Sequence, residues 1–151
     1  MKVSKILLLS LLLCLLSGVS TTASAQPRHA AFLHALSDLK LMRAYLSKPT
    51  PDGRIDNDQA AALAEIDAAI QEINQASIDD GRNPNARVPA DATLPPADRW
   101  RHAREAGDAA WHDLDREEDN DFANGLKHRA MGHIEKANHI VDRIIKMRNY
   151  Q

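Results

Sequence analysis

Cysteine is nearly absent from this sequence, and its absence removes several kinds of chemistry. The one cysteine among 151 residues is Cys14, which lies in an apolar N-terminal run. Residues 26–151 therefore cannot form disulfides, thiolate metal sites, thiol nucleophiles or c-type haem attachments. Serine is scarce there too, because Ser37, Ser47 and Ser77 are the only ones and none lies in a nucleophile motif. We therefore expect a protein that is not an enzyme and that carries no cofactor.

The chain also lacks an excess of positive charge. Without Lys2 and Lys5 of the N-terminal segment, 17 Lys and Arg residues stand against 21 Asp and Glu residues, a net charge of −4. Nucleic-acid binding depends largely on neutralising phosphates with Lys and Arg. The balance of charge therefore argues against a nucleic-acid partner.

Long apolar runs are missing except at the N-terminus, where residues 1–25 have the pattern of a cleaved signal peptide. Two lysines precede an apolar run at 6–16, and the small residues at 23–25 suit signal peptidase. The run is too short to span a bilayer comfortably, which takes about 20 residues. We expect export to the periplasm or out of the cell, no stable membrane anchor after cleavage, and one domain at 26–151.

Strand-like alternation is also missing, whereas apolar residues recur at three- and four-residue spacings, the period of an α-helix. This spacing predicts four amphipathic helices at about 28–47, 57–79, 97–118 and 122–147. Four prolines between the second and third helices predict a Pro-rich strap at 82–96. The third and fourth helices are predicted to meet in a tight turn near 119–121, with a single bent helix as the alternative.

Each predicted helix has one apolar face, and two such helices cannot bury their faces alone. The sequence therefore predicts an all-α fold, an up-down antiparallel four-helix bundle. Its predicted core is Phe32, Ala35, Leu36, Leu39, Met42 and Leu46; Leu63, Ile66, Ala69, Ile70 and Ile73; Trp100, Ala103, Gly107, Ala110 and Leu114; and Leu126, Ala130, Ile134, Ala137, Val141 and Ile144.

The two halves of the predicted bundle resemble each other at an offset of 68 residues. The matching residues are His34-Ala35 with His102-Ala103, Leu46 with Leu114, Ala62-Leu63 with Ala130-Met131, Ile66 with Ile134, and Ala69 with Ala137. Alanine-rich amphipathic helices also resemble each other by chance. Two related helical hairpins are therefore a hypothesis at this point.

Four stretches of the chain are similar to segments of small, uncharacterised exported bacterial helical proteins. The stretches are HALSDLKLMRAYL, EIDAAIQEI, IDDGRN and EEDNDFANGLKHRAMGHIEKA. This resemblance implies export and helical structure. It implies no activity, because none of the four contains a catalytic motif.

The stretch PTPDGRIDND at 49–58 looks like the centre of a calcium-binding loop, but its ligands do not fit one. If Gly53 takes the glycine position of a twelve-residue EF-hand loop, Lys48 falls where the first carboxylate is needed, and Gln59 replaces the bidentate glutamate. The residues suit a capping box better, with Asp56 as the N-cap of the second helix and Gln59 bonding back to it. The stretch therefore predicts a helix start.

Histidine is plentiful, with seven residues in the chain, and imidazole is a common metal ligand. The seven contain no HExxH motif and no pair at i and i+4, but several have an acid four residues away. Such pairs usually act as solvated surface groups. The alternative is a weak zinc or copper site, for which the candidate ligands are Asp98, His102, Asp108 and His112.

An acidic cluster is predicted where the loop between the first two helices meets the turn between the last two. In an up-down bundle both connections lie at the same end. That end would collect Asp52, Asp56, Asp58, Glu117, Glu118, Asp119 and Asp121. The usual role of such a cluster is to complement helix N-termini, and the functional alternatives are cation binding or docking of a partner protein.

Three functions stay open from the sequence. The first is a non-enzymatic interaction module, and the second is a periplasmic metal-binding protein that uses the acid–histidine pairs. The third is a small-ligand carrier, with a cavity beside Trp100 and Trp111 where the third helix is rich in alanine and glycine. The oligomeric state does not follow from the sequence.

Overall fold

Four helices account for almost all of the described structure. The computed structural model describes residues 30–77, 94–116 and 123–149. Within these ranges the chain forms no strand and four helices: α1 (Ala30–Leu46), α2 (Gly53–Ser77), α3 (Pro96–Arg116) and α4 (Ala123–Asn149). The predicted all-α four-helix bundle is confirmed, and α3 and α4 are separate helices. The predicted signal peptide lies outside the described residues, as does most of the predicted strap at 82–96.

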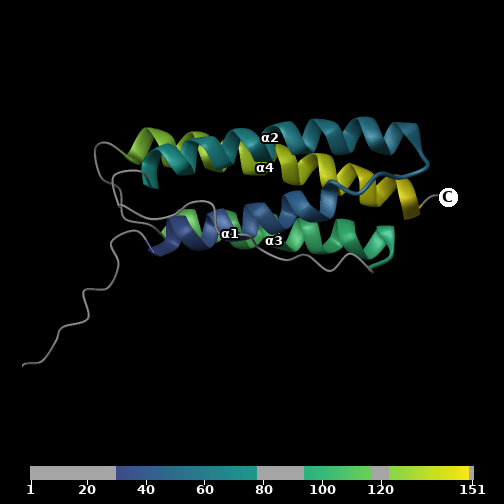
Figure 1. Ribbon diagram of the computed structural model, residues 1–151, viewed down its shortest axis with the longest axis horizontal. Helices are drawn as coiled ribbons and strands as arrows, with labels where there is room; N and C mark the ends of the chain where they lie inside the picture. Colours follow the sequence, from purple (N-terminus) through teal and green to yellow (C-terminus); the bar gives the residue numbers. More distant parts are fainter. Residues whose placement is uncertain (1–29, 78–93, 117–122, 150–151) are drawn as a thin grey trace, which may run out of the picture.

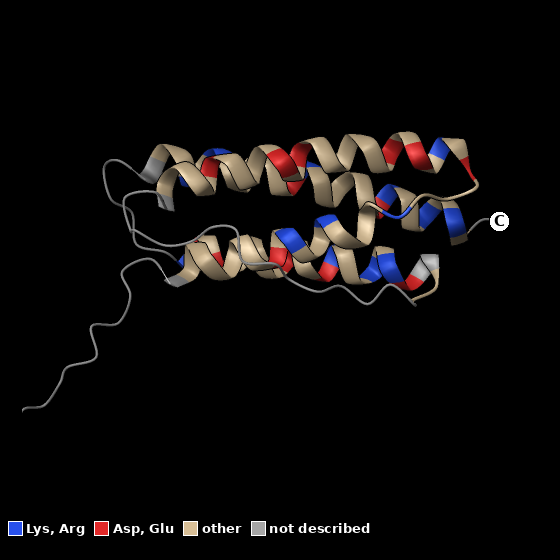
Figure 2. Cartoon of the chain, in the orientation of Figure 1, with Lys and Arg blue, Asp and Glu red and all other residues tan. Residues whose placement is uncertain are grey.

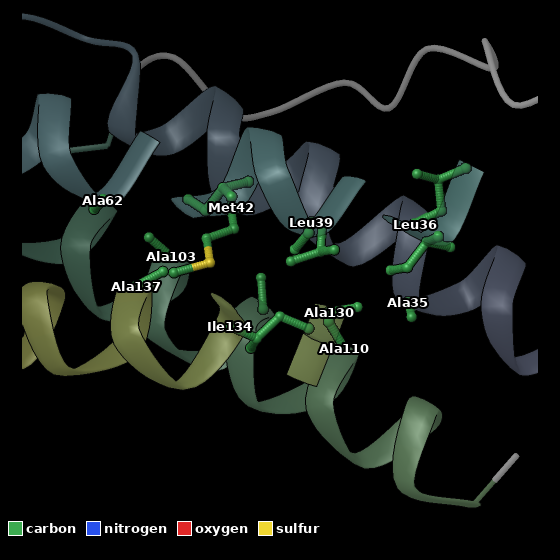
Figure 3. Close-up of a cluster of buried hydrophobic side chains, with 14 of the residues drawn as sticks. Ala35, Leu36, Leu39, Met42, Ala62, Ala103, Ala110, Ala130, Ile134 and Ala137 are labelled. Atoms are coloured by element: carbon green, nitrogen blue, oxygen red, sulfur yellow. The ribbon is translucent and has the colours of Figure 1, made fainter. Parts of the chain in front are cut away.

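The core lies where the helical spacing predicts it. The six predicted core residues of α1 are at most 3% exposed, and those of α4 are at most 5% exposed. Figure 3 shows Met42 of α1 reaching toward Ala103 of α3 and Ala137 of α4, and Leu39 of α1 pointing toward Ile134 of α4. Two predicted members of α2, Leu63 and Ile70, are only partly buried. None of the four described helices combines the length and apolar character that a membrane crossing requires.

The directions of the helices depart from simple alternation along the chain. In Figure 1, α1 and α4 run one way, whereas α2 and α3 run the other way. The packed pairs are α1 with α2, α3 with α4, α1 with α3, and α2 with α4. Every packed pair is therefore antiparallel, as predicted for the bundle. We call the end that holds Leu46, Gly53, Pro96 and Asn149 the C-terminal end, and the other the opposite end.

Chain length permits this arrangement. The α2 helix has 25 residues, about 37 Å at 1.5 Å per residue. The 18 residues between Ser77 and Pro96 could reach about 60 Å if extended, which is enough to return along the whole bundle. The connection is therefore long enough for α3 to begin at the same end as α2, as it does.

Seven-residue spacing also fixes the register of α2 against α4. Three acids of α2 face three bases of α4 in reverse order, and the pairs are Asp58–Arg143 at 2.7 Å, Glu65–Lys136 at 3.9 Å and Glu72–Arg129 at 2.8 Å. His133 Nδ1 also lies 2.6 Å from Glu65 Oε2. Exposed pairs of this kind each contribute less than about 1 kcal/mol, so their main effect is on register.

The start of α2 differs from the predicted capping box. The backbone N–H of Arg54 donates to Asp52 Oδ1 at 2.9 Å, so Asp52 is the N-cap. The backbone N–H of Asp56 donates to the Asp52 carbonyl, which places Asp56 inside the first turn. Its carboxylate accepts hydrogen bonds from the backbone N–H and the hydroxyl of Thr50. The helix starts four residues before the predicted start, and Gln59 is free for another role.

Gln59 joins three helices at the C-terminal end of the bundle. Its Nε2 donates to the carbonyls of Leu46 and Lys48, at 3.0 and 2.9 Å, where α1 ends. Its Oε1 accepts the indole N–H of Trp100 in α3 at 2.9 Å. The last carbonyls of a helix have no partner within the helix, so this buried amide satisfies that of Leu46 and, just beyond the helix, that of Lys48.

Several contacts recur at the offset of 68 residues, which supports two related hairpins. Arg43–Asp67 joins α1 to α2, and the equivalent residues Trp111–Glu135 join α3 to α4. Gln59 corresponds to Lys127, another buried polar residue, whose Nζ donates to the Asp115 carbonyl at the end of α3. Glu65 and His133, which contact each other, are themselves 68 residues apart. The hairpins α1–α2 and α3–α4 therefore share one plan.

Candidate binding groove between α3 and α4

The four predicted metal ligands all lie on α3. Their described contacts are with other side chains, and no described hydrogen bond or ion pair joins either predicted acid–histidine pair. Asp98 pairs with Arg101. His102 Nδ1 lies 3.0 Å from Glu105 Oε2, and its ring stacks on Tyr45 with centroids 5.8 Å apart.

Asp108 and His112, the second predicted pair, also contact other side chains. Asp108 pairs with Arg104, and the His112 ring meets the edge of Trp111. Within the described ranges, no three His, Asp or Glu side chains gather as a metal site would require. The acid–histidine metal site stays a prediction.

The predicted acidic end is described only in part. Asp52, Asp56 and Asp58 lie at the C-terminal end, where Asp52 caps α2, Asp56 binds Thr50 and Asp58 pairs with Arg143. The other four predicted members, Glu117, Glu118, Asp119 and Asp121, lie outside the described residues. Arg116 and Ala123, which flank them, lie at the opposite end. The described helix ends on either side of the two connections therefore lie at opposite ends of the bundle, because α3 runs parallel to α2, and the acidic cluster as a whole stays a prediction.

A hollow on the seam between α3 and α4 gathers polar groups instead. It measures about 280 Å³, is open to solvent, and is lined by Arg104, Asp108, Trp111, Glu135, Asn138 and His139. We call these six residues the α3–α4 groove. Only Asp108 was among the residues that the sequence singled out as ligands.

Arg104 is the cation of this groove, and two carboxylates hold it. Its Nε donates to Asp142 Oδ1 at 3.0 Å, and its Nη1 contacts Asp108 on the same helix. Burial alone would lower the pKa of Arg104, but the bonds to Asp108 and Asp142 outweigh it and raise the pKa. The guanidinium is therefore charged at any physiological pH.

Asn138 brings a buried amide to the same seam. It is 7% exposed, and its Nδ2 donates to Asp108 Oδ1 over a long 3.4 Å. Its Oδ1 is buried without a hydrogen-bond partner among the described residues. The amide lies against Gly107, where an added Cβ would collide with Asn138 Oδ1 and approach Met42 Sδ to 3.1 Å. Gly107 thus leaves the space that Asn138 occupies.

Trp111 forms the aromatic wall of the groove. Its indole N–H donates to Glu135 Oε1 at 3.0 Å, so Glu135 holds the ring in place. Trp111 is partly exposed, whereas Trp100, the other tryptophan of the chain, is 1% exposed. A flat aromatic face beside carboxylates is a common arrangement for holding cations.

The first hairpin shows how the same seam looks without these groups. At the offset of 68, Leu36 corresponds to Arg104, Leu39 to Gly107, Arg43 to Trp111 and Ile70 to Asn138. Leu36 and Leu39 are core residues, and Ile70 packs against the core. The second hairpin thus carries an arginine, a glycine and an asparagine where the first carries three aliphatic side chains.

The net charge of the groove and its border is negative. Asp108, Glu135 and Asp142 supply three carboxylates against the single guanidinium of Arg104. A positively charged group would find carboxylates and the Trp111 ring within one hollow. Helical periodicity could not reveal this site, because it treats polar residues as surface. The repeat could have done so, since it pairs Arg104 and Asn138 with aliphatic residues.

Comparison with known proteins adds no relative. No protein-family model matches the chain, and no curated protein or solved structure matches it either. The functional argument therefore rests on the geometry of the α3–α4 groove.

Proposed function

We propose that the protein is an exported, non-enzymatic binding module whose ligand places a positively charged group in the α3–α4 groove. One observation carries the proposal: Arg104 and Asn138 occupy seam positions that Leu36 and Ile70 fill in the first hairpin. A buried amide without its hydrogen bonds costs about 1–3 kcal/mol. The first hairpin also has a buried amide oxygen, Asn74 Oδ1, without a partner among the described residues, but at the positions equivalent to Arg104 and Asn138 it has aliphatic side chains, so we attribute the polar groups of the second seam to a ligand.

The chemistry of the groove favours a cation over an anion or a neutral group. An ammonium or guanidinium can contact the carboxylates of Asp108 and Glu135 and lie against the Trp111 ring. A cation over an aromatic face gains about 0.5–2 kcal/mol, depending on how far it is desolvated. Arg104 does not oppose this, because Asp108 and Asp142 both pair with it.

The exported and non-enzymatic parts of the proposal rest on the sequence. Residues 1–25 have the pattern of a signal peptide, and residues 26–151 lack cysteine and any serine nucleophile motif. The groove also changes where the ligand of a small-ligand carrier would bind. The ligand would lie at the surface of the α3–α4 seam and not in a cavity inside the bundle.

Tryptophan fluorescence tests the proposal directly, because Trp111 lies in the groove and Trp100 is buried. We expect 1,4-diaminobutane to change the emission of the purified protein with saturation, whereas succinate, an anion of similar length, leaves it unchanged. Trp111→Phe should abolish the change. Glu135→Gln keeps an acceptor for the indole but removes a charge, so affinity should fall about tenfold, which corresponds to 1.4 kcal/mol.

Asp58→Asn is the matched control. Like Glu135, Asp58 is an acid that contacts a side chain of a neighbouring helix, in this case Arg143, but it lies outside the groove. Its loss should leave the affinity for diaminobutane unchanged. Equal responses to diaminobutane and succinate, or no response to either, would overturn the proposal.

A further inference from the structure

A second hollow lies on the same seam, nearer the C-terminal end, and it has the opposite charge. It measures about 130 Å³ and is lined by Trp100, Arg101, Ile145, Arg148 and Asn149. These five residues include two arginines and no acid. In Figure 2, Lys and Arg gather on α3 and α4 at this end of the bundle. We call this hollow the Arg148 pocket.

The Arg148 pocket has a rigid wall. The Arg148 guanidinium carbon lies 5.8 Å from the centroid of the Trp100 ring, and Gln59 fixes that ring through the indole N–H. Arg101 shares its charge with Asp98, one turn back on α3. No acid among the described residues pairs with Arg148, so its charge is available to an anion.

Both hollows lie on one face of the α3–α4 seam. The contacts Arg104–Asp142, Asp108–Asn138 and Trp111–Glu135 keep a constant antiparallel register along it. Arg101 lies one turn before Arg104, and Ile145 lies one turn after Asp142. The Arg148 pocket therefore continues the line of the α3–α4 groove, with the Arg104–Asp142 pair between them.

The separation of the two charged regions sets a length for the ligand. Seven residues of α3 separate Arg101 from Asp108, and ten separate Arg101 from Trp111. At 1.5 Å per residue these spans are about 10 and 15 Å. An extended peptide rises about 3.3 Å per residue, so three or four residues span about 10–13 Å, which lies within this range.

We propose that the seam binds free peptides of three or four residues, with the α-carboxylate in the Arg148 pocket and the α-ammonium in the α3–α4 groove. This inference rests on the proposed function, because it names the cation of the groove as a peptide N-terminus. The two opposite charges fix the direction of the peptide. The Arg104–Asp142 pair lies between them, where guanidinium N–H groups and a carboxylate can bond to the peptide backbone.

A length series of free alanine peptides, from dialanine to hexaalanine, tests the inference by Trp111 fluorescence and by calorimetry. We expect affinity to peak at three or four residues and to exceed that of dialanine at least tenfold. Amidation of the C-terminus of trialanine should weaken binding about tenfold, and acetylation of its N-terminus should do the same.

Variants separate the two ends of the ligand. Arg148→Gln should weaken free trialanine about tenfold, have no effect on amidated trialanine, and leave 1,4-diaminobutane binding unchanged. Lys146→Gln is the matched control, because Lys146 is exposed on the same turn of α4 but does not line the Arg148 pocket. It should change none of these affinities.

The outcomes distinguish this inference from the proposed function. If diaminobutane binds but the free peptides show no length optimum and no dependence on Arg148, the peptide inference is overturned and the cation-binding groove stands. If neither diaminobutane nor any peptide binds, both are overturned.

Discussion

The two hairpins of this bundle share a plan and differ at their seams. In α1–α2, the positions equivalent to those of the groove hold aliphatic residues such as Leu36 and Leu39, which belong to the core. In α3–α4, the equivalent positions hold Arg104 and Gly107, and a hollow of about 280 Å³ opens beside them. The helices, their antiparallel packing and much of the core are common to both. A few side chains therefore determine whether the seam of a hairpin is closely packed or contains a groove.

The comparison also explains why the open seam is informative. Burying polar groups is unfavourable unless they find partners, and Asn138 Oδ1 finds none among the described residues. In most proteins it is hard to say what a site would contain if it had no function. Here the first hairpin supplies that reference within the same chain.

The same comparison extends to the buried polar residues that bind the helix ends. Gln59 joins α1, α2 and α3 through hydrogen bonds of 2.9–3.0 Å, whereas the bond of its counterpart Lys127 to the Asp115 carbonyl is longer, at 3.3 Å. The first hairpin thus relies on this position more heavily than the second.

Replacement of Gln59 should give the largest loss of stability. Gln59→Leu keeps the size of the side chain but leaves the buried Trp100 N–H and the carbonyls of Leu46 and Lys48 without their partner. We expect the free energy of unfolding to fall by about 2–3 kcal/mol, measured by urea denaturation.

Lys127→Met provides the comparison for Gln59. It removes one long bond to a helix-end carbonyl and keeps the apolar stem, so we expect a loss of about 0.5–1 kcal/mol. Equal losses of stability in the Gln59 and Lys127 variants would show that the two hairpins do not differ at this position.

Asp38 should give a smaller effect of the opposite sign. Burial raises the pKa of Asp38, the nearby Asp113 raises it further, and His34 lowers it. The folded protein therefore binds this proton more tightly than the unfolded chain does. The favourable contribution is complete below the unfolded pKa and is lost as the pH rises through the raised folded pKa.

Asp38→Asn should therefore stabilise the protein at pH 7. Asp38 is only partly buried, so solvent screens its charge and we expect a gain below about 0.5 kcal/mol. The equivalent residue of the second hairpin, Ala106, carries no charge at all. The gain should be measured by urea denaturation at pH 7 and at pH 3, and it should vanish at the lower pH. A gain that persists at pH 3 would show that the charge is not its cause.

Much of the fold could be predicted from the sequence, because helical periodicity depends only on which residues are apolar. The faces of α1 and α4 were correct to the residue, including Phe32, Leu39 and Ile134. The direction of α3 could not be predicted, because a connection as long as the one between Ser77 and Pro96 can join α3 at either end. That one ambiguity put the described junction ends of α3 and α4, Arg116 and Ala123, at the other end of the bundle from Asp52.

The groove was largely hidden for a different reason. Arg104, Asn138 and Gln59 are polar, so periodicity assigns them to the surface, and only their partners on other helices explain their burial. Asp108 was singled out, but as a metal ligand beside His112. The offset of 68 residues was the useful signal, because it placed Arg104 opposite Leu36 and Asn138 opposite Ile70.

The most direct test of the account gives the second hairpin the aliphatic residue of the first at the position of Asn138. In the variant Asn138→Ile, we measure the free energy of unfolding and the affinity for 1,4-diaminobutane together. We predict that stability rises by about 1–3 kcal/mol, because a buried amide with an unbonded oxygen is replaced by an apolar side chain, and that affinity falls at least tenfold, because the acceptor oxygen in the groove is lost. Unchanged binding, or a loss of stability, would contradict the claim that this seam is built for a ligand.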